Sequence, residues 1–191
     1  PYTNIKSLIN QNGLLKSFPS VDDAPKVFHE QNEIHEIYNS KTYKRDSAYV
    51  IDITWPVFDE SKGNTEFAVK LNQLVTNLLP FSGANVKQTV NDMIATYKSM
   101  EQADDFGMYW TFTSDISAYF PTTNIVSIMK FEWEYAGGAH GNGVTLYFNI
   151  DEATQKVLTL DDLLIPGGRE KLNLIAETIF RDDYEIAENV S

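Results

Sequence analysis

Two glutamates and one histidine in a short segment are the side chains best placed to do chemistry. Glu132 and Glu134 are followed by His140, and Asp151 comes further along the chain. Oxygen and imidazole groups of this kind could bind a metal ion, and two carboxylates could act as acid and base in hydrolysis. Hydrolysis that uses Glu132, Glu134 and His140 is therefore one hypothesis for the function.

The surrounding pattern favours a role without catalysis. Glu132 and Glu134 alternate with Phe131, Trp133 and Tyr135, so we expect a strand with one aromatic face and with the acids on its outer face. A zinc hydrolase normally presents three ligands at a characteristic spacing such as His-Glu-x-x-His, which is absent here. The sequence also has no Gly-x-Ser-x-Gly motif, phosphate-binding loop or dinucleotide fingerprint. We therefore expect no catalytic residue, no metal ion and no cofactor.

The histidine lies in a glycine-rich loop that has two interpretations. Glycine adopts backbone angles that other residues avoid, and the loop contains Gly137, Gly138, Gly141 and Gly143. In the structural interpretation, the ring of His140 forms hydrogen bonds with backbone groups and fixes a tight loop. In the binding interpretation, the loop and the nearby aromatic rings face a ligand. The rings could stack on a sugar, and the acidic groups beside them could attract a basic protein. The side chains expected to face that ligand are Tyr135, His140, Asn142 and Tyr147.

The composition is that of an acidic globular protein. Of 191 residues, 42% are hydrophobic, and 27 acidic against 15 basic residues give a formal net charge of −12. This charge repels phosphate backbones and anionic membranes, so we expect no nucleic-acid partner. The absence of cysteine excludes disulfides, and no apolar run reaches the roughly 20 residues of a transmembrane helix. Because the chain begins at Pro1 rather than Met, we expect that a leader or lipoprotein signal has been removed.

Residue spacing predicts both strands and helices. Pro56 is expected to end its strand or to place it at an edge, and Asp161 and Asp162 are expected to cap a helical turn. His29 and His35 fit ordinary exposed strand positions, because neither has metal-site spacing.

Alternation predicts strands at 48–55, 108–119, 125–135, 144–150 and 157–160, with weaker strand character at 34–38. Apolar stripes predict helices at 67–78, 86–97 and 172–180, and a short amphipathic helix within 5–15.

Together these elements predict an α+β fold. We expect an antiparallel sheet that is covered mainly on one side by helices at 64–79 and 85–101, with the final helix on the C-terminal half. Residues 1–25 are a segment of uncertain structure. Residues 26–121 are expected to form an N-terminal α+β half, and residues 122–191 a C-terminal half with the Gly-Gly-Ala-His loop. The two motif-level halves, which divide near Pro121, are expected to form one compact unit.

The order of motifs from residue 135 onward resembles a known family. Tyr-Ala-Gly-Gly-Ala-His-Gly at 135–141 is followed by Tyr-Phe-Asn-Ile-Asp at 147–151, by Lys-Val-Leu-Thr-Leu-Asp-Asp-Leu-Leu at 156–164, and then by a helix. This order resembles bacterial extracytoplasmic domains such as the outer domain of the lysozyme-sensing anti-sigma factor RsiV and the non-catalytic N-terminal region of the peptidoglycan deacetylase PdaC. The resemblance covers the chain from about Val27 onward, and Tyr-x-Gly-Gly-Ala-His is its most specific part.

The resemblance implies a location in the periplasm or at the cell surface, near the cell wall. Members usually continue into further strands, so we expect this chain to be truncated relative to them, with a sheet edge that is exposed or pairs with another chain. We favour a non-catalytic module that binds or senses a cell-envelope glycan or a protein such as a lysozyme-like muramidase. The alternatives are an envelope-glycan hydrolase or deacetylase, and a structural or assembly domain of an envelope protein.

Overall fold

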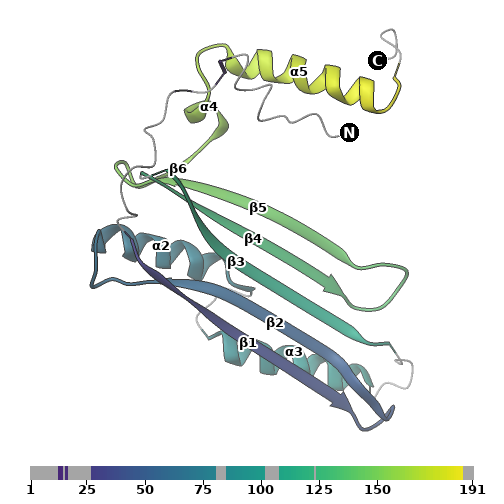
Figure 1. The fold of residues 1–191 in the computed structure, drawn as a ribbon. Helices are drawn as coiled ribbons and strands as arrows, with labels where there is room; N and C mark the ends of the chain where they lie inside the picture. The colour runs from purple at the N-terminus through teal and green to yellow at the C-terminus, as the bar shows by residue number, and fades with distance from the viewer. Residues whose placement is uncertain are drawn as a thin grey trace. The chain divides into compact units, whose positions relative to one another are not determined.

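The computed structural model forms two compact units. One unit comprises residues 21–156, and the other combines residues 1–20 with residues 157–191. The residues that the structure describes are 13, 14, 16, 27–80, 85–101, 108–122 and 124–186, and Figure 1 shows their secondary structure. The predicted boundary near Pro121 falls inside the larger unit, and the division into motif-level halves stays a prediction. The amphipathic helix predicted within residues 5–15 lies almost wholly outside the described residues.

The larger unit is built on a mostly antiparallel sheet. From β1 to β5, neighbouring strands are antiparallel except β2 and β3, which are parallel. A parallel pair needs a crossover connection, and here the crossover contains helices α2 (Thr65–Leu78) and α3 (Val86–Glu101). The predicted α+β fold is therefore confirmed. In spatial order the strands are β1 (His29–Ser40), β2 (Arg45–Phe58), β3 (Trp110–Thr122), β4 (Ile125–Tyr135), β5 (Asn142–Asp151) and β6 (Lys156–Leu158).

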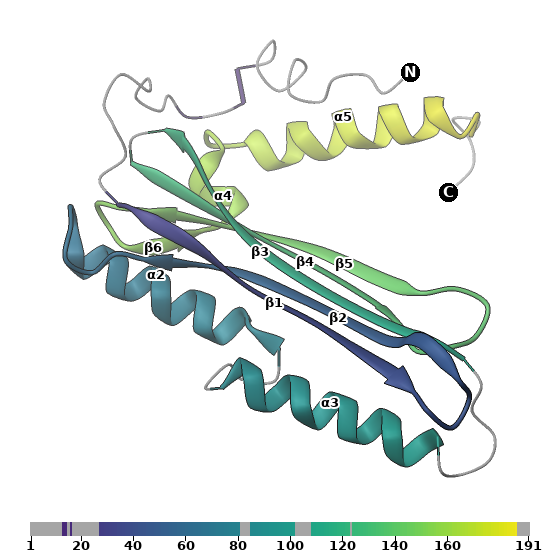
Figure 2. The same ribbon diagram turned by 60° about the horizontal axis from the view of Figure 1, so that its bottom comes forward.

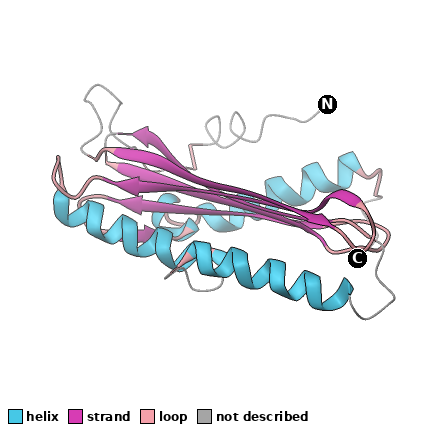
Figure 3. Cartoon of the chain, turned by 90° about the horizontal axis from the view of Figure 1, so that it is seen from below, coloured by secondary structure: helices cyan, strands magenta, loops and turns pink. Residues whose placement is uncertain are grey.

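Both crossover helices pack on the same face of the sheet, which we call the helical face (Figures 2 and 3). Helix α2 packs on β2, and α3 packs on β1 and β2. Every second residue of each strand points to this face, and the buried strand residues join the apolar stripes of the two helices in one core. The main contributors are Tyr49, Ile51, Ile53, Phe112, Ile116, Val126 and Ile128 from the strands, and Phe67, Leu71, Val75, Val90 and Tyr97 from the helices.

Two asparagine side chains hold α2 in place. Asn64 is the N-cap residue, and its side-chain oxygen accepts a hydrogen bond from the backbone N–H of Phe67 at 3.2 Å. Asn72, on the following turns, pairs with the end of β2 because its amide accepts from the N–H of Phe58 at 2.8 Å and donates to the carbonyl of the same residue at 2.9 Å. The start of the helix and its contact with the strand are thus both fixed by side-chain amides.

Pro56 does not end β2, which continues to Phe58. The pairing of β2 with β3 stops at Thr54 opposite Asp115, so the N–H group that proline lacks is not needed for that ladder. Opposite Pro56 on β1, Gln31 donates a side-chain hydrogen bond to the carbonyl of Ile116 on β3 at 3.0 Å. Of the two expected alternatives, the strand end was therefore wrong, whereas an edge position agrees with the structure, because β2 at Pro56 is paired with β1 alone.

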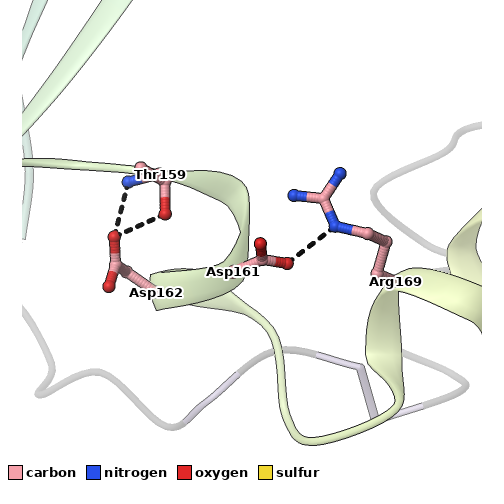
Figure 4. A network of polar contacts seen from close by, with 4 residues as sticks. All are labelled: Thr159, Asp161, Asp162 and Arg169. Carbon is pink, nitrogen blue, oxygen red and sulfur yellow. Dashed lines mark hydrogen bonds and ion pairs between the residues drawn. The ribbon is translucent and has the colours of Figure 1, made fainter.

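The smaller unit contains the short helix α4 (Leu160–Leu163) and the helix predicted at 172–180, which is α5 (Gly168–Asp183). Asp162 caps α4 as expected, since its carboxylate accepts hydrogen bonds from the backbone N–H and the hydroxyl of Thr159 at 2.7 and 2.6 Å (Figure 4). Asp161 instead accepts a hydrogen bond from Nε of Arg169 at 2.7 Å. None of the helices in the described ranges is long and apolar enough to span a membrane.

Candidate functional site

The face of the sheet opposite α2 and α3 carries a group of aromatic side chains. Phe131, Trp133 and Tyr135 point to this face because Val126 and Ile128, at the alternate positions of β4, point to the helical face. Tyr147 of β5 is directly opposite Met129 and so shares their face. The ring of Tyr109 lies 5.0 Å from that of Tyr135. We call Tyr109, Phe131, Trp133, Tyr135 and Tyr147 the aromatic face.

The aromatic face is accessible in the larger unit. Tyr147 is 65% exposed, Tyr109 54% and Trp133 37%, whereas Phe131 and Tyr135 are half-buried. Side chains two residues apart on a strand are separated by roughly 7 Å, so the three aromatic residues of β4 form a row along the strand. The predicted strand with one aromatic face is present, and its rings are not buried together in the core.

Polar groups lie beside the aromatic face on the neighbouring strands. Asp115 of β3, directly opposite Phe131, accepts hydrogen bonds from the hydroxyls of Thr54 and Ser117, both at 2.8 Å. Asp52 of β2 is paired through the register with Thr113, which is itself opposite Trp133. The surface therefore combines aromatic rings with carboxylate and hydroxyl groups in adjacent rows.

His35 of β1 joins this polar region through an ion pair. Its Nδ1 lies 2.5 Å from Oδ1 of Asp52 on β2, and both side chains are exposed. The hydrogen bond to Asp52 and the negative charge of that residue raise the pKa of His35 above its ordinary value. His29, by contrast, packs between Phe58 and Phe120, with both ring separations 5.5 Å, and burial lowers its pKa. Both residues lie on β1 as expected, but only His35 occupies an exposed position, whereas His29 is half-buried.

We expect His35 to titrate at a higher pH than His29 in NMR titrations of the imidazole resonances. The substitution Asp52→Asn should lower the His35 midpoint, because the amide does not favour the charged ring. The stabilisation from this pair is present below the pKa of His35 in the unfolded chain and is lost as the pH rises through the raised pKa of the folded state. A His35 midpoint that stays in place when Asp52 is replaced would contradict the assignment.

The glycine loop between β4 and β5 is fixed mainly by aromatic side chains. The hydroxyl of Tyr135 donates a hydrogen bond to the carbonyl of Gly138 at 2.9 Å, and Gly138 has a φ of +103°, which glycine adopts readily. The indole of Trp133 lies so close to two other glycines, Gly141 and Gly143, that a Cβ at either position would approach it to within 3 Å. His140 is exposed, and its Nδ1 lies 3.0 Å from the carbonyl oxygen of the adjacent Gly141.

The four residues predicted to bind a ligand do not all lie together. Tyr135 and Tyr147 share the aromatic face, but Tyr147 pairs with Met129, which places the two tyrosines roughly 20 Å apart along the strands. Asn142 is directly opposite Glu134 and therefore points to the helical face. His140 belongs to the loop beyond both strands. Trp133 and Phe131, between the two tyrosines, are the residues that connect them into one surface.

Glu132 and Glu134 lie on the helical face and not, as we expected, on the outer face. They are opposite Ser114 and Phe112 of β3, which belong to the buried side of the sheet. Glu132 forms an ion pair with Lys130 at 2.8 Å. Among the described residues, no three histidine, cysteine, aspartate or glutamate side chains form a group that could hold a metal ion.

Glu134 lines a cavity between α3 and the sheet. This cavity was not predicted from the sequence. The cavity has a volume of about 400 Å³ and is also lined by Tyr49, Thr89, Asp92, Met93, Thr96 and Trp110. Four of these residues lie on α3 at the three- and four-residue spacing of one helix side, a signal that the sequence does contain. The other three lining residues, Tyr49, Trp110 and Glu134, come from three different strands. They lie beside α3 because of the register of the sheet, which the sequence pattern does not reveal.

The helical and aromatic faces define the larger unit as an α+β domain with one packed and one accessible side of its sheet. Residues 42–143, just over half of the chain, match the family described as deacetylase PdaC, so the chain belongs to this family.

Two solved structures have a similar fold. A member of the DUF3298 family from Bacteroides fragilis superposes with a TM-score of 0.60 at 17% sequence identity, and the match covers 86% of this chain and 72% of the other. A DUF3298 family protein from Pseudomonas aeruginosa gives a TM-score of 0.50 at 17% identity, with 88% and 72% covered. These likenesses show a shared fold. No curated protein sequence matches the chain.

Proposed function

We propose that this domain is a non-catalytic extracytoplasmic module that binds a cell-envelope glycan through its aromatic face. Membership of the PdaC family supports a location in the periplasm or at the cell surface. The observation that carries the proposal is the accessible row of Phe131, Trp133 and Tyr135, continued by Tyr147 on the next strand.

Aromatic rings on a sheet face suit the chemistry of sugars. A pyranose ring presents C–H groups on its faces, and these pack against the electron-rich face of an aromatic ring. Tyrosine and tryptophan also present a polar atom that can form hydrogen bonds with hydroxyl groups. Because the side chains on this face follow the strand direction, an extended glycan chain could contact Tyr135, Trp133 and Tyr147 in turn.

The polar groups beside the rings suit sugar hydroxyls. Asp52 and Asp115 present carboxylate oxygens on the same face, and these accept hydrogen bonds. The net charge of −12 opposes an anionic ligand. A neutral or amino-bearing glycan therefore fits this surface better than a strongly acidic polymer does.

Binding should be measured with purified peptidoglycan sacculi in a pull-down and with soluble N-acetylglucosamine oligomers by calorimetry. We expect Trp133→Ala and Tyr147→Ala each to weaken binding on the order of tenfold, because each removes a stacking ring. Tyr184→Ala is the matched control, since Tyr184 is 69% exposed but lies at the end of α5. Circular dichroism should verify that all three variants are folded.

The same experiment separates the alternatives. Glycan binding that survives the double replacement of Trp133 and Tyr147 would contradict the assigned face. A domain that binds a muramidase but none of the glycans would point to the protein ligand instead. Release of acetate or of shortened glycan on incubation would favour the enzyme hypothesis, which rests on Glu132, Glu134 and His140.

A further inference from the structure

The cavity between α3 and the sheet has aromatic walls that meet at a steep angle. The rings of Tyr49 and Trp110 lie 5.5 Å apart with an interplanar angle of 86°. Tyr97 packs against both of them, at 5.5 Å from Tyr49 and 5.2 Å from Trp110. Because Tyr49 and Tyr97 are buried in the core, these rings form a fixed corner, to which Met93 adds a thioether.

The polar groups of the cavity are all neutral or acidic. Asp92 of α3 and Glu134 of β4 contribute carboxylates from two elements, and Thr89 and Thr96 contribute hydroxyls. No lysine, arginine or histidine belongs to the described lining. Burial raises the pKa of Tyr49, and the negative charge of Glu134 raises it further. The cavity therefore combines two carboxylates, both on exposed residues, with an aromatic corner.

This combination selects for one kind of ligand. A cation is attracted to the faces of aromatic rings, and most strongly where water is partly excluded. Carboxylates add attraction for the same charge and disfavour an anion. Calcium and magnesium, in contrast, take six or more oxygen ligands, and the aromatic walls cannot supply them.

We propose that this cavity binds an organic ammonium group carried by a small soluble molecule. The cation lies against Tyr49 and Trp110, Glu134 and Asp92 balance its charge, and the threonine hydroxyls contact its polar substituents. The site is on the helical face, so it is separate from the aromatic face and does not depend on glycan binding there.

The test uses choline and its neutral isostere 3,3-dimethyl-1-butanol, which have the same shape but differ in charge. Each is titrated into isotopically labelled protein at constant ionic strength, and amide and indole shifts are followed by NMR. We expect saturable shifts at Thr89, Asp92 and Trp110 with choline, and at least a tenfold weaker response with the isostere. Glucosamine and N-acetylglucosamine form a second charged and neutral pair, which tells an amino-sugar ligand from an alkylammonium ligand.

Glu134→Gln and Asp92→Asn should each weaken choline binding on the order of tenfold with little change in thermal stability. Glu132→Gln is the matched control, because Glu132 lies two residues away on the same strand face but is paired with Lys130 and is absent from the lining. Choline and its isostere binding equally would overturn the proposal. So would the absence of a saturable shift with both cations, or an equal effect of the Glu132 and Glu134 substitutions.

Discussion

Replacing Phe67 with alanine is expected to lower the free energy of unfolding by about 3–5 kcal/mol. Phe67 is 0% exposed and lies on the first turns of α2, the helix that packs on β2. The substitution removes a large apolar group from water-free surroundings and leaves a cavity that the sheet cannot fill by a local shift. Chemical denaturation followed by circular dichroism would measure the loss.

The same helix offers a control for this prediction. Val69 is 36% exposed, so Val69→Ala should change stability by no more than about 0.5 kcal/mol. If Phe67→Ala does not fold, Phe67→Leu should fold and should lose less, because it removes less volume. Equal losses for Phe67→Ala and Val69→Ala would mean that α2 does not contribute its apolar stripe to the core.

Local periodicity predicted most of the elements of the larger unit. The alternation of Tyr49, Ile51 and Ile53 indicates a strand because one side of each strand is buried, and the spacing of Phe67 and Leu71 indicates a helix for the same reason. Both patterns follow from the geometry of the backbone over a few residues. They can therefore be read without knowing where the neighbouring elements lie.

The facing of β4 could not be predicted in the same way. Val126 and Ile128 are apolar at even positions, whereas Phe131, Trp133 and Tyr135 are aromatic at odd positions, so the two ends of the strand favour opposite faces. The helices pack on β1 and β2, so the side of the sheet that they cover is the packed side. Which side this is depends on contacts between distant segments. For this reason Glu132 and Glu134 lie on the helical face and not on the expected outer face.

The parallel pairing of β2 and β3 is likewise a property of the whole domain. Two apolar strands that are separated by helices can pair in either direction, and the residue pattern does not distinguish the two. The structure pairs β2 and β3 in parallel, and α2 and α3 lie in the crossover that such a pair needs. The cavity depends on this arrangement, because Trp110 at the start of β3 is directly opposite Tyr49 of β2. Its residues come from four elements, so no single sequence window contains the site.

Replacing Gly141 with alanine should destabilise the domain by about 1–3 kcal/mol, since inserting a methyl group into a packed site forces neighbours to move. A Cβ there would lie 2.5 Å from Cζ2 of Trp133 and 2.9 Å from the carbonyl oxygen of Glu134. Asn142→Ala is the control, because Asn142 is adjacent in the sequence and its exposed side chain points to the other face. Thermal and chemical denaturation of both variants would measure the difference.

A double-mutant cycle with Trp133→Ala tests whether the indole is the cause. Removing the ring opens the space above Gly141 but leaves the backbone oxygen of Glu134 in place, so the rescue should be partial. We expect the double variant to lose less stability than the sum of the single variants, by more than about 0.5 kcal/mol. Because Gly141→Ala must displace the indole, it should also weaken glycan binding in the same direction as Trp133→Ala. Strict additivity would show that the loop and the aromatic face are independent, and that the glycines serve the backbone turn alone.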